Sequence, residues 1–280
     1  LLLVCVCGTT DWDVAELLRH VESGSREEQI AALDQLERAA IDGKLGEQRG
    51  EVIARCASLL TSEDGEIADT ACDVLSWLDA EVLPAMTELL RSEDDHAQGF
   101  AARVLAAVAS REREDPKKLD AAIPELEKLM RDGGKYARHN AFYAMSALGP
   151  KAIPLMAQNL DAEDYFFNVM MRGFLRHGEL SIGPLAQALS SEDAVIRRNA
   201  ACALFRIATH KPETLPRMKA DALEPLTEAI GDEDSLVRAQ ANDALGRMGE
   251  HAAGSLNLIV AALEEDEPAY LAIAGAVAQI

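Results

Sequence analysis

The sequence is poor in aromatic residues, in paired cysteines and in positive charge. Only 4% of its 280 residues are Phe, Trp or Tyr, a small share for a β-sandwich, a barrel or an enzyme with a compact pocket. The five cysteines are odd in number and lack paired spacing, so we expect no disulfide framework and a reducing compartment. There are 48 acidic residues against 27 Lys and Arg, a net charge of -21. Such a surface repels nucleic-acid phosphates and anionic bilayers, so we predict neither as a partner.

An apolar segment at the amino terminus, residues 1–10, stands apart from the rest of the chain. The run from Leu1 to Gly8 is too short to span a bilayer and lacks a basic segment. It is either the remnant of a signal peptide, which implies a secreted or periplasmic protein, or an apolar cap at a fragment boundary. We expect the second and a cytoplasmic protein. The carboxy terminus at Ile280 lies within a helical pattern without a stop signal, which indicates a piece of a longer chain.

An internal repeat of about 30 residues dominates the sequence. The string Leu-x-Ser-Glu-Asp ends at Asp64, Asp94 and Asp193, and variants of it end at Asp164 and Asp234. Small or apolar residues recur seven and eleven positions after each of these turn residues. Diverged copies begin from Ser25, Gly134 and Glu267, which makes about eight units.

Each unit predicts two helices joined by a short acidic turn. A proline opens the first helix, and the turn Asp caps the free amides of the second helix. Positions 3, 7, 10, 11 and 14 after the turn residue form one apolar stripe, which a single hairpin cannot bury. We therefore predict an all-α fold in which the units stack as one array over residues 11–280, with charged inserts at 111–118 and 210–219. The prolines are Pro84, Pro124, Pro154, Pro184 and Pro225.

The segment from Pro225 to Gly249 resembles a HEAT-like repeat. Asp234, Val237 and Arg238, followed by Ala241, Ala244, Leu245 and Gly246, match the pattern of that family. The first units depart from it, because Ala68 and Gln98 stand where the family has Arg. The resemblance implies a right-handed α-solenoid of about eight hairpins with the second helices on the concave side. It implies little about function, since scaffolds, transport factors, lyases and a few other enzymes share the fold.

The sequence offers no motif for catalysis or for a cofactor. It contains no G-x-S-x-G, no phosphate-binding glycine loop and no H-E-x-x-H. No histidine is followed by Glu, the dipeptide that binds di-iron in the similar deoxyhypusine hydroxylases. The acidic turns lack the ligand spacing of a calcium loop. We expect a protein that is not an enzyme and holds no metal or cofactor, with Cys56, Cys72 and Cys202 as small residues in or beside the core.

The charge and the aromatic residues are unevenly distributed. Residues 1–130 have a net charge of -15, residues 131–198 of +1 and residues 199–280 of -7, and seven of the twelve aromatic residues lie between 136 and 174. Positions 4, 8 and 12 of the second helices lie opposite the stripe, with positions 5 and 9 beside them. Arg, Tyr and Phe are typical of interface cores, and guanidinium groups suit carboxylates. The predicted partner-binding residues are Arg138, His139, Phe142, Tyr143, Arg172, Arg176 and Arg198.

These observations favour a non-catalytic scaffold that presents a concave helical surface to a protein or peptide with acidic groups. Two alternatives remain. The first is a subunit similar to the phycobilin lyases, whose HEAT-like repeats handle a tetrapyrrole. The second is an architectural spacer within a larger chain. For Arg197 and Arg238 a structural role is an alternative to partner binding, since each can pair with the turn Asp one helical turn earlier.

Overall fold

The computed structural model describes residues 12–111, 116–161, 164–255 and 257. Every regular element in these residues is a helix, which confirms the all-α prediction. The apolar segment 1–10 and the predicted last unit, which begins from Glu267, lie outside the described residues. The chain divides into two compact units, residues 1–144 (unit 1) and 145–280 (unit 2), which are described separately.

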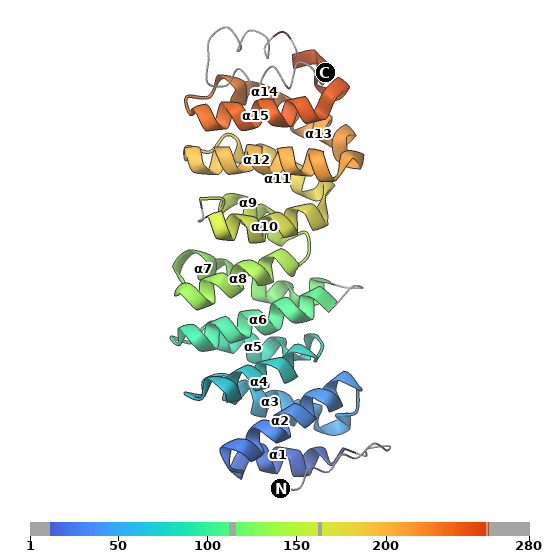
Figure 1. The fold of residues 1–280 in the computed structure, drawn as a ribbon, viewed down its shortest axis with the longest axis vertical. Coiled ribbons are helices and arrows are strands. Elements are labelled where there is room, and N and C mark those ends of the chain that lie inside the picture. The colour runs from blue at the N-terminus through green and yellow to red at the C-terminus, as the bar shows by residue number, and fades with distance from the viewer. Residues whose placement is uncertain (1–11, 112–115, 162–163, 256, 258–280) are drawn as a thin grey trace. The chain divides into compact units, whose positions relative to one another are not determined.

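Unit 1 is a stack of helical hairpins in chain order (Figure 1). Each hairpin pairs a first helix with a second helix, and the boundary with unit 2 falls near the end of the last second helix. The pairs are α1 (Val14–Ser23) with α2 (Arg26–Ile41), α3 (Arg49–Leu59) with α4 (Gly65–Ser76), α5 (Leu83–Leu90) with α6 (Asp95–Arg111), and α7 (Ile123–Asp132) with α8 (Lys135–Ala147). Short 3₁₀ helices precede α3, α5 and α7, namely η1 (Gly46–Gln48), η2 (Ala80–Val82) and η3 (Pro116–Ala122).

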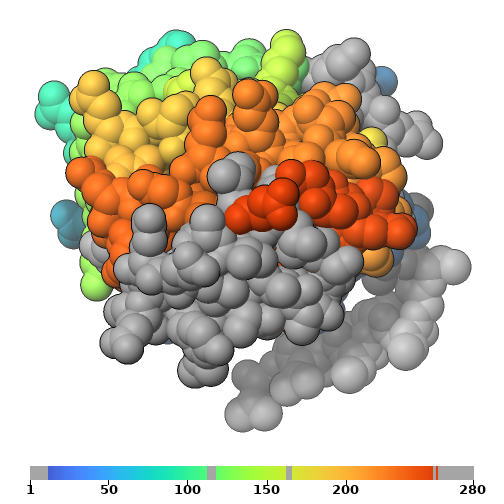
Figure 2. Space-filling view, turned by 90° about the horizontal axis from the view of Figure 1, so that it is seen from above, coloured from blue at the N-terminus to red at the C-terminus, as the bar shows by residue number. Residues whose placement is uncertain are grey.

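Unit 2 repeats the arrangement with an additional short helix. The pairs are α9 (Ala152–Gln158) with α10 (Asp164–His177), α11 (Glu179–Ala188) with α12 (Ala194–His210), and α14 (Leu223–Glu228) with α15 (Ser235–Met248). The predicted insert at 210–219 forms η4 (Pro212–Thr214) and most of α13 (Leu215–Asp221), and η5 (Ala229–Gly231) and η6 (Gly249–Ser255) flank α15. The second helices α12 and α15 pack side by side, and Figure 2 shows this end of unit 2 in space-filling form. The stacked hairpins confirm an α-solenoid.

The turn residues cap the second helices as predicted. Asp64 accepts hydrogen bonds from the amides of Glu66 and Ile67, and Asp234 accepts them from Leu236 and Val237. Ser25 and Glu28 form a reciprocal capping box at the start of α2. Each cap satisfies amides that the helix itself leaves without a partner, so the acidic turns have a structural role.

The prolines open the first helices with one exception. Pro84 and Pro124 lie in the first turn of α5 and α7. Pro184, however, lies inside α11, which begins five residues earlier at Glu179. The prediction that each of these prolines begins a helix is therefore wrong for α11.

In α2, α6, α12 and α15, the side chain four positions after the turn residue ties the second helix to the preceding turn or to the end of the preceding helix. Gln29 donates to the carbonyl of Val21, and Gln98 donates to the carbonyls of Leu90 and Ser92. Arg197 donates to the carbonyls of Ser191 and Glu192, and Arg238 to those of Asp232 and Glu233. The glutamines of unit 1 thus perform the same bonding task as the arginines of unit 2.

Arg197 also links two successive repeats. Its Nε and Nη2 lie 2.7 and 3.0 Å from the carboxylate oxygens of Asp232, and both side chains are about 10% exposed. The predicted partner, Asp193, instead caps α12. The expectation of an i,i+4 pair is therefore wrong for Arg197, because the next repeat brings a better placed carboxylate.

The core follows the predicted stripe. The small residues seven positions after the turn are buried, as are the leucines at position eleven of α2, α4, α6, α12 and α15, whereas Leu175 at this position of α10 is only half-buried. Phe167 and Phe174, predicted as core, are 6% and 0% exposed. Gly173 lets α10 approach the end of α8 within unit 2, since a Cβ there would lie 3.0 Å from the Cα of Ser146.

Candidate functional site, an arginine-rich face on unit 2

The accessible row of the second helices differs from the predicted one. In α12 the residues at positions 5, 9 and 13 (Arg198, Cys202 and Arg206) are half-buried, whereas Arg197 and Ala201 at positions 4 and 8 are buried. The predicted row of positions 4, 8 and 12 holds only for α10, where Asn168, Arg172 and Arg176 are exposed. Position 8 is buried in α2, α4, α6, α12 and α15, and contacts join α2 to α4, α4 to α6 and α12 to α15.

The predicted residues of unit 1 lie on α8 and are largely engaged within the protein. Phe142 is completely buried, so its prediction as an accessible residue is wrong. Arg138 is half-buried, and its guanidinium lies 5.9 Å from the centre of the Phe142 ring. His139 and Tyr143 are half-buried and stack with ring centres 5.0 Å apart. Burial lowers the pKa of His139 below its ordinary value, so this ring is neutral at pH 7.

The predicted arginines of unit 2 lie at the surface. Arg172 and Arg176 are exposed on α10, and Arg198 is half-buried on α12. The guanidinium of Arg176 donates to the carbonyl of Ala147 at 3.3 Å. Beside it, Nε2 of His177 is 2.9 Å from the carbonyl oxygen of Leu148. This contact fixes His177 at the end of α10, where the sequence predicts the end of a helix.

A groove of about 440 Å³ is lined in part by Arg198. Its lining comes from α10, α12 and α15, so three successive second helices contribute to it. The apolar part is formed by Phe167, Leu236 and the thiol of Cys202, and Leu236 is 51% exposed. The polar part consists of Asn168, Arg198, Asn199, Arg206 and Gln240.

Two arginines of this region were not predicted. Arg206 lies with its guanidinium 5.6 Å from the centre of the Phe167 ring and donates to the amide oxygen of Asn168 at 3.0 Å. Arg247 on α15 lies 5.7 Å from the centre of the Phe205 ring. Both occupy position 13, one step beyond the row that the sequence indicated. Counting every fourth residue from position 5 would have found them.

We define the arginine face as Arg172, Arg176, Arg198, Arg206 and Arg247. Among the described residues, no carboxylate lies within ion-pair distance of any of these five side chains. The carboxyl of Asp243 on α15 interacts with the charge of Arg247. Burial raises its pKa above the ordinary carboxyl value, although the charge of Arg247 opposes the shift.

Several arginines of unit 1, unlike those of the arginine face, form ion pairs with carboxylates. Arg103 on α6 bridges Asp69 and Asp73 of α4 at 2.6 and 2.8 Å. Ion pairs with carboxylates are also formed by five further arginines of unit 1, namely Arg26, Arg49, Arg55, Arg91 and Arg131. In unit 1 these six guanidinium groups therefore neutralise part of the acidic surface of the protein itself.

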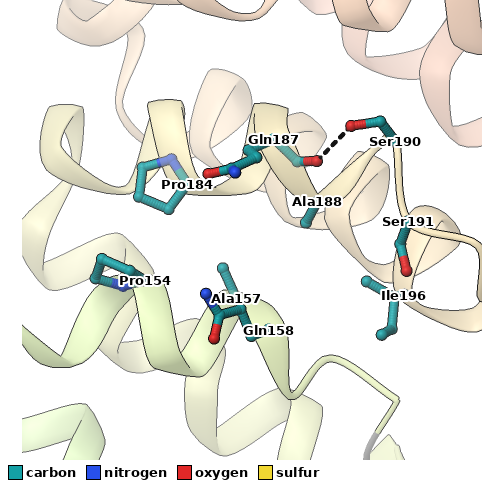
Figure 3. A pocket seen from close by; sticks show the side chains of 9 residues that line it. All are labelled: Pro154, Ala157, Gln158, Pro184, Gln187, Ala188, Ser190, Ser191 and Ile196. Carbon is teal, nitrogen blue, oxygen red and sulfur yellow. Dashed lines mark hydrogen bonds between the residues drawn. The ribbon is translucent and has the colours of Figure 1, made fainter.

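A second hollow lies on the first helices of unit 2 (Figure 3). It has a volume of about 340 Å³ and is lined by α9, α11 and the turn before α12. Pro154 and Pro184 flank one side, and the amides of Gln158 and Gln187 project into the space. No titratable side chain lines this hollow, so it offers no group for acid–base chemistry.

The thiols and acidic groups show no reactive arrangement. Burial raises the pKa of Cys56 to about 12 and that of Cys72 to about 11, so both thiols stay protonated in the core. Burial also raises the pKa of Cys202. Within the described ranges, no three His, Cys, Asp or Glu side chains are grouped as a metal ion would require. In the same ranges no helix combines the length and apolar character needed to cross a membrane.

The comparison with protein families agrees with the hairpin geometry. Residues 182–278, which include α12 and α15, match the family model of HEAT repeats. Over residues 182–278 the chain is a HEAT-like repeat protein. No curated protein matches it.

Solved structures resemble this HEAT-like repeat protein only distantly. An engineered protein shares 23% identity with a TM-score of 0.46, over 95% of this chain and 78% of its own. A designed armadillo repeat protein in complex with the peptide (KR)4 shares 17% identity with a TM-score of 0.40, over 85% of this chain and 100% of its own. At this level of similarity, what the engineered proteins bind says nothing of this chain.

Proposed function

We propose that this protein is a non-catalytic interaction scaffold whose unit 2 binds an acidic segment of a partner protein at the arginine face. One observation supports the proposal above the others. In a chain with a net charge of -21, five arginines are gathered on three neighbouring second helices and none of them forms an ion pair within the described part of the chain. By contrast, six arginines of unit 1 are paired with carboxylates of the chain itself.

The chemistry of the face suits a carboxylate partner. A guanidinium presents a planar fork of donors that matches a carboxylate, and it loses less hydration on binding than an ammonium group does. Arg206 and Arg247 lie over aromatic rings, which limits the rotamers of both side chains before a ligand binds. Preorganised side chains lose less conformational entropy on association.

The test compares partner capture by the wild type and by the variant Arg172→Glu/Arg176→Glu. Both side chains are exposed, and Arg172 forms no hydrogen bond or ion pair with the described residues, so the fold should persist, which circular dichroism checks. We expect the variant to lose the captured protein. Arg217→Glu on α13 is the control, because it reverses the charge of an exposed arginine that pairs with Asp221 and does not belong to the arginine face.

Equal capture by the wild type and the double variant would contradict a site on the arginine face. Loss of capture in the Arg217→Glu control as well would indicate a nonspecific charge effect. The absence of any partner for the wild type would favour the spacer alternative. Acquisition of colour on incubation with a bilin would favour the lyase-like alternative.

A further inference from the structure

We infer that the arginine face binds its partner as an extended segment, with acidic side chains three residues apart and one apolar side chain seated in the groove between Phe167, Cys202 and Leu236. This inference rests on the proposed function and specifies the form of the partner. The observation behind it is that the face is built from three successive second helices, α10, α12 and α15, with a groove among them.

The spacing of the arginines indicates the spacing of the ligand's charges. Packed helices lie about 8–10 Å apart, so successive helices offer guanidinium groups at about that interval. An extended chain advances about 3.3 Å per residue. Three residues of an extended segment therefore span the distance from one second helix to the next. An acidic residue at every third position meets Arg172 or Arg176, then Arg198 or Arg206, then Arg247.

The polar lining of the groove favours an extended segment over a helical one. An extended segment has backbone N–H and C=O groups without internal partners, whereas a helix satisfies its own. Gln240 brings a side-chain amide to the groove from α15, while the amide oxygen of Asn168 on α10 already accepts from Arg206. Amides can donate to carbonyls and accept from amides, so they suit an exposed peptide backbone.

The apolar lining offers a seat for one side chain. Phe167 and Leu236 come from different helices, and the thiol of Cys202 lies on the helix between them. Arg198 and Arg206 are four residues to either side of Cys202 on α12, so both ends of the seat are positively charged. A segment with an apolar residue between acidic residues matches this alternation.

The same features disfavour a single-stranded nucleic acid as the ligand. Binding of single strands relies on aromatic side chains that stack against bases. Phe167 is 6% exposed, and Arg206 and Arg247 lie over the rings of Phe167 and Phe205. Guanidinium groups without exposed rings fit carboxylates better than bases.

The experiment measures fluorescence anisotropy of the full chain with labelled peptides of equal composition at low salt. Each 12-residue peptide contains four Glu, one central Leu and seven Ser. In the spaced peptide the Glu residues stand three apart, and in the clustered peptide they are contiguous. We expect the spaced peptide to bind about fivefold or more tightly than the clustered one. A third peptide with Lys in place of Glu should show no binding.

Matched variants locate the binding. We expect Arg172→Gln/Arg198→Gln to weaken binding of the spaced peptide about tenfold, since two charge-assisted contacts are lost. Arg217→Gln, which removes an exposed arginine of α13, should leave the affinity unchanged. Leu236→Ser should weaken the spaced peptide but not a peptide in which Ser replaces the central Leu.

Different failures separate the two proposals. Equal affinity for the spaced and clustered peptides would contradict binding of an extended segment. Tighter binding of an alanine-rich helical peptide with Glu seven residues apart would contradict it as well. Neither result would contradict the proposal that the partner is acidic. No binding of any acidic peptide up to millimolar concentration would overturn both. Tighter binding of labelled (dT)12 than of the peptides would also overturn both, in favour of a nucleic acid.

Discussion

Arg197 shows how one buried side chain connects two repeats of unit 2. It is 8% exposed, binds Asp232 of the next repeat and donates to two carbonyls of its own turn. We expect Arg197→Met to lower the free energy of unfolding by about 3 kcal/mol, because Asp232 would remain buried without its charged partner. Urea unfolding at pH 7 measures the loss. A loss below about 0.5 kcal/mol would contradict a stabilising pair.

The same pair predicts a response to acid. Burial opposes ionisation of Asp232, but hydrogen bonds from Arg197 and from the Asp234 amide hold the pKa of this carboxyl below its ordinary value. A lowered pKa contributes stability above the unfolded carboxyl value of about 3.8, and this stability is lost as the pH falls through the lowered pKa. Unfolding of the wild type should therefore depend more steeply on pH below about 4 than unfolding of Arg197→Met does.

Asp243 affects the pH dependence of stability in the direction opposite to Asp232. Burial raises its pKa, so its charged form is destabilised in the folded protein, and stability falls as the pH rises through the carboxyl range. We expect Asp243→Asn to raise the thermal midpoint at pH 7 and to leave it nearly unchanged at pH 3. The variant should also bind the spaced peptide more tightly, because it removes the negative charge beside Arg247. A lower midpoint at pH 7 would contradict the assignment of burial as the dominant cause.

At the scale of an element, the position of α10 depends on one glycine. A Cβ at Gly173 would lie 2.8 Å from the Cε of Met156 and 3.0 Å from the Cα of Ser146. Met156 can move, but the backbone at Ser146 cannot do so without shifting α8. We expect Gly173→Ala to destabilise the protein by about 1–3 kcal/mol, which is the usual effect of overpacking. Chemical unfolding of the full chain measures it.

Gly65 provides the control for this substitution. It is the first residue of α4, and a Cβ there would meet no atom within 4 Å. Gly65→Ala should be neutral or stabilising by up to about 1 kcal/mol, since alanine reduces the freedom of the unfolded chain. Equal destabilisation by both substitutions would mean that the close approach at Gly173 is not the cause.

The helices and their caps could be predicted from the sequence because they depend on local pattern. The turn residue, the small residue at position seven and the leucine at position eleven are all read within one unit, and α2, α4 and α12 follow them. The orientation of the accessible row could not be predicted in this way. Positions 4 and 5 differ by about 100° around a helix, and the neighbouring repeats decide which of them is buried.

The candidate site was predicted in part for the same reason. Arg172, Arg176 and Arg198 lie at the surface as predicted, while Phe142 is in the core. The partner of Arg197 stands 35 residues away in the sequence, which local spacing does not indicate. Arg206 and Arg247 were missed because the row beside the predicted one was followed through positions 5 and 9 but not on to position 13.

At the scale of the whole molecule, the net charge of -21 sets the response to salt. Self-repulsion destabilises a compact state of such charge, and salt screens it. We expect the thermal midpoint to rise by roughly 2–4 °C, equivalent to about 1 kcal/mol, between 10 and 200 mM NaCl. The same change should weaken binding of the spaced peptide. A midpoint that falls with salt would mean that the surface ion pairs outweigh the repulsion.

The junction between α10 and α11 limits how the chain can be re-engineered. Gly178 is the single residue between these helices, and its φ of 49° is a conformation that side-chain-bearing residues rarely adopt. A reporter domain inserted there would separate two helices that the connection holds together. The exposed turn at Gly43 has open space around it and joins α2 to the next hairpin through several residues. Fluorescent fusions for locating the partner in cells belong at that turn.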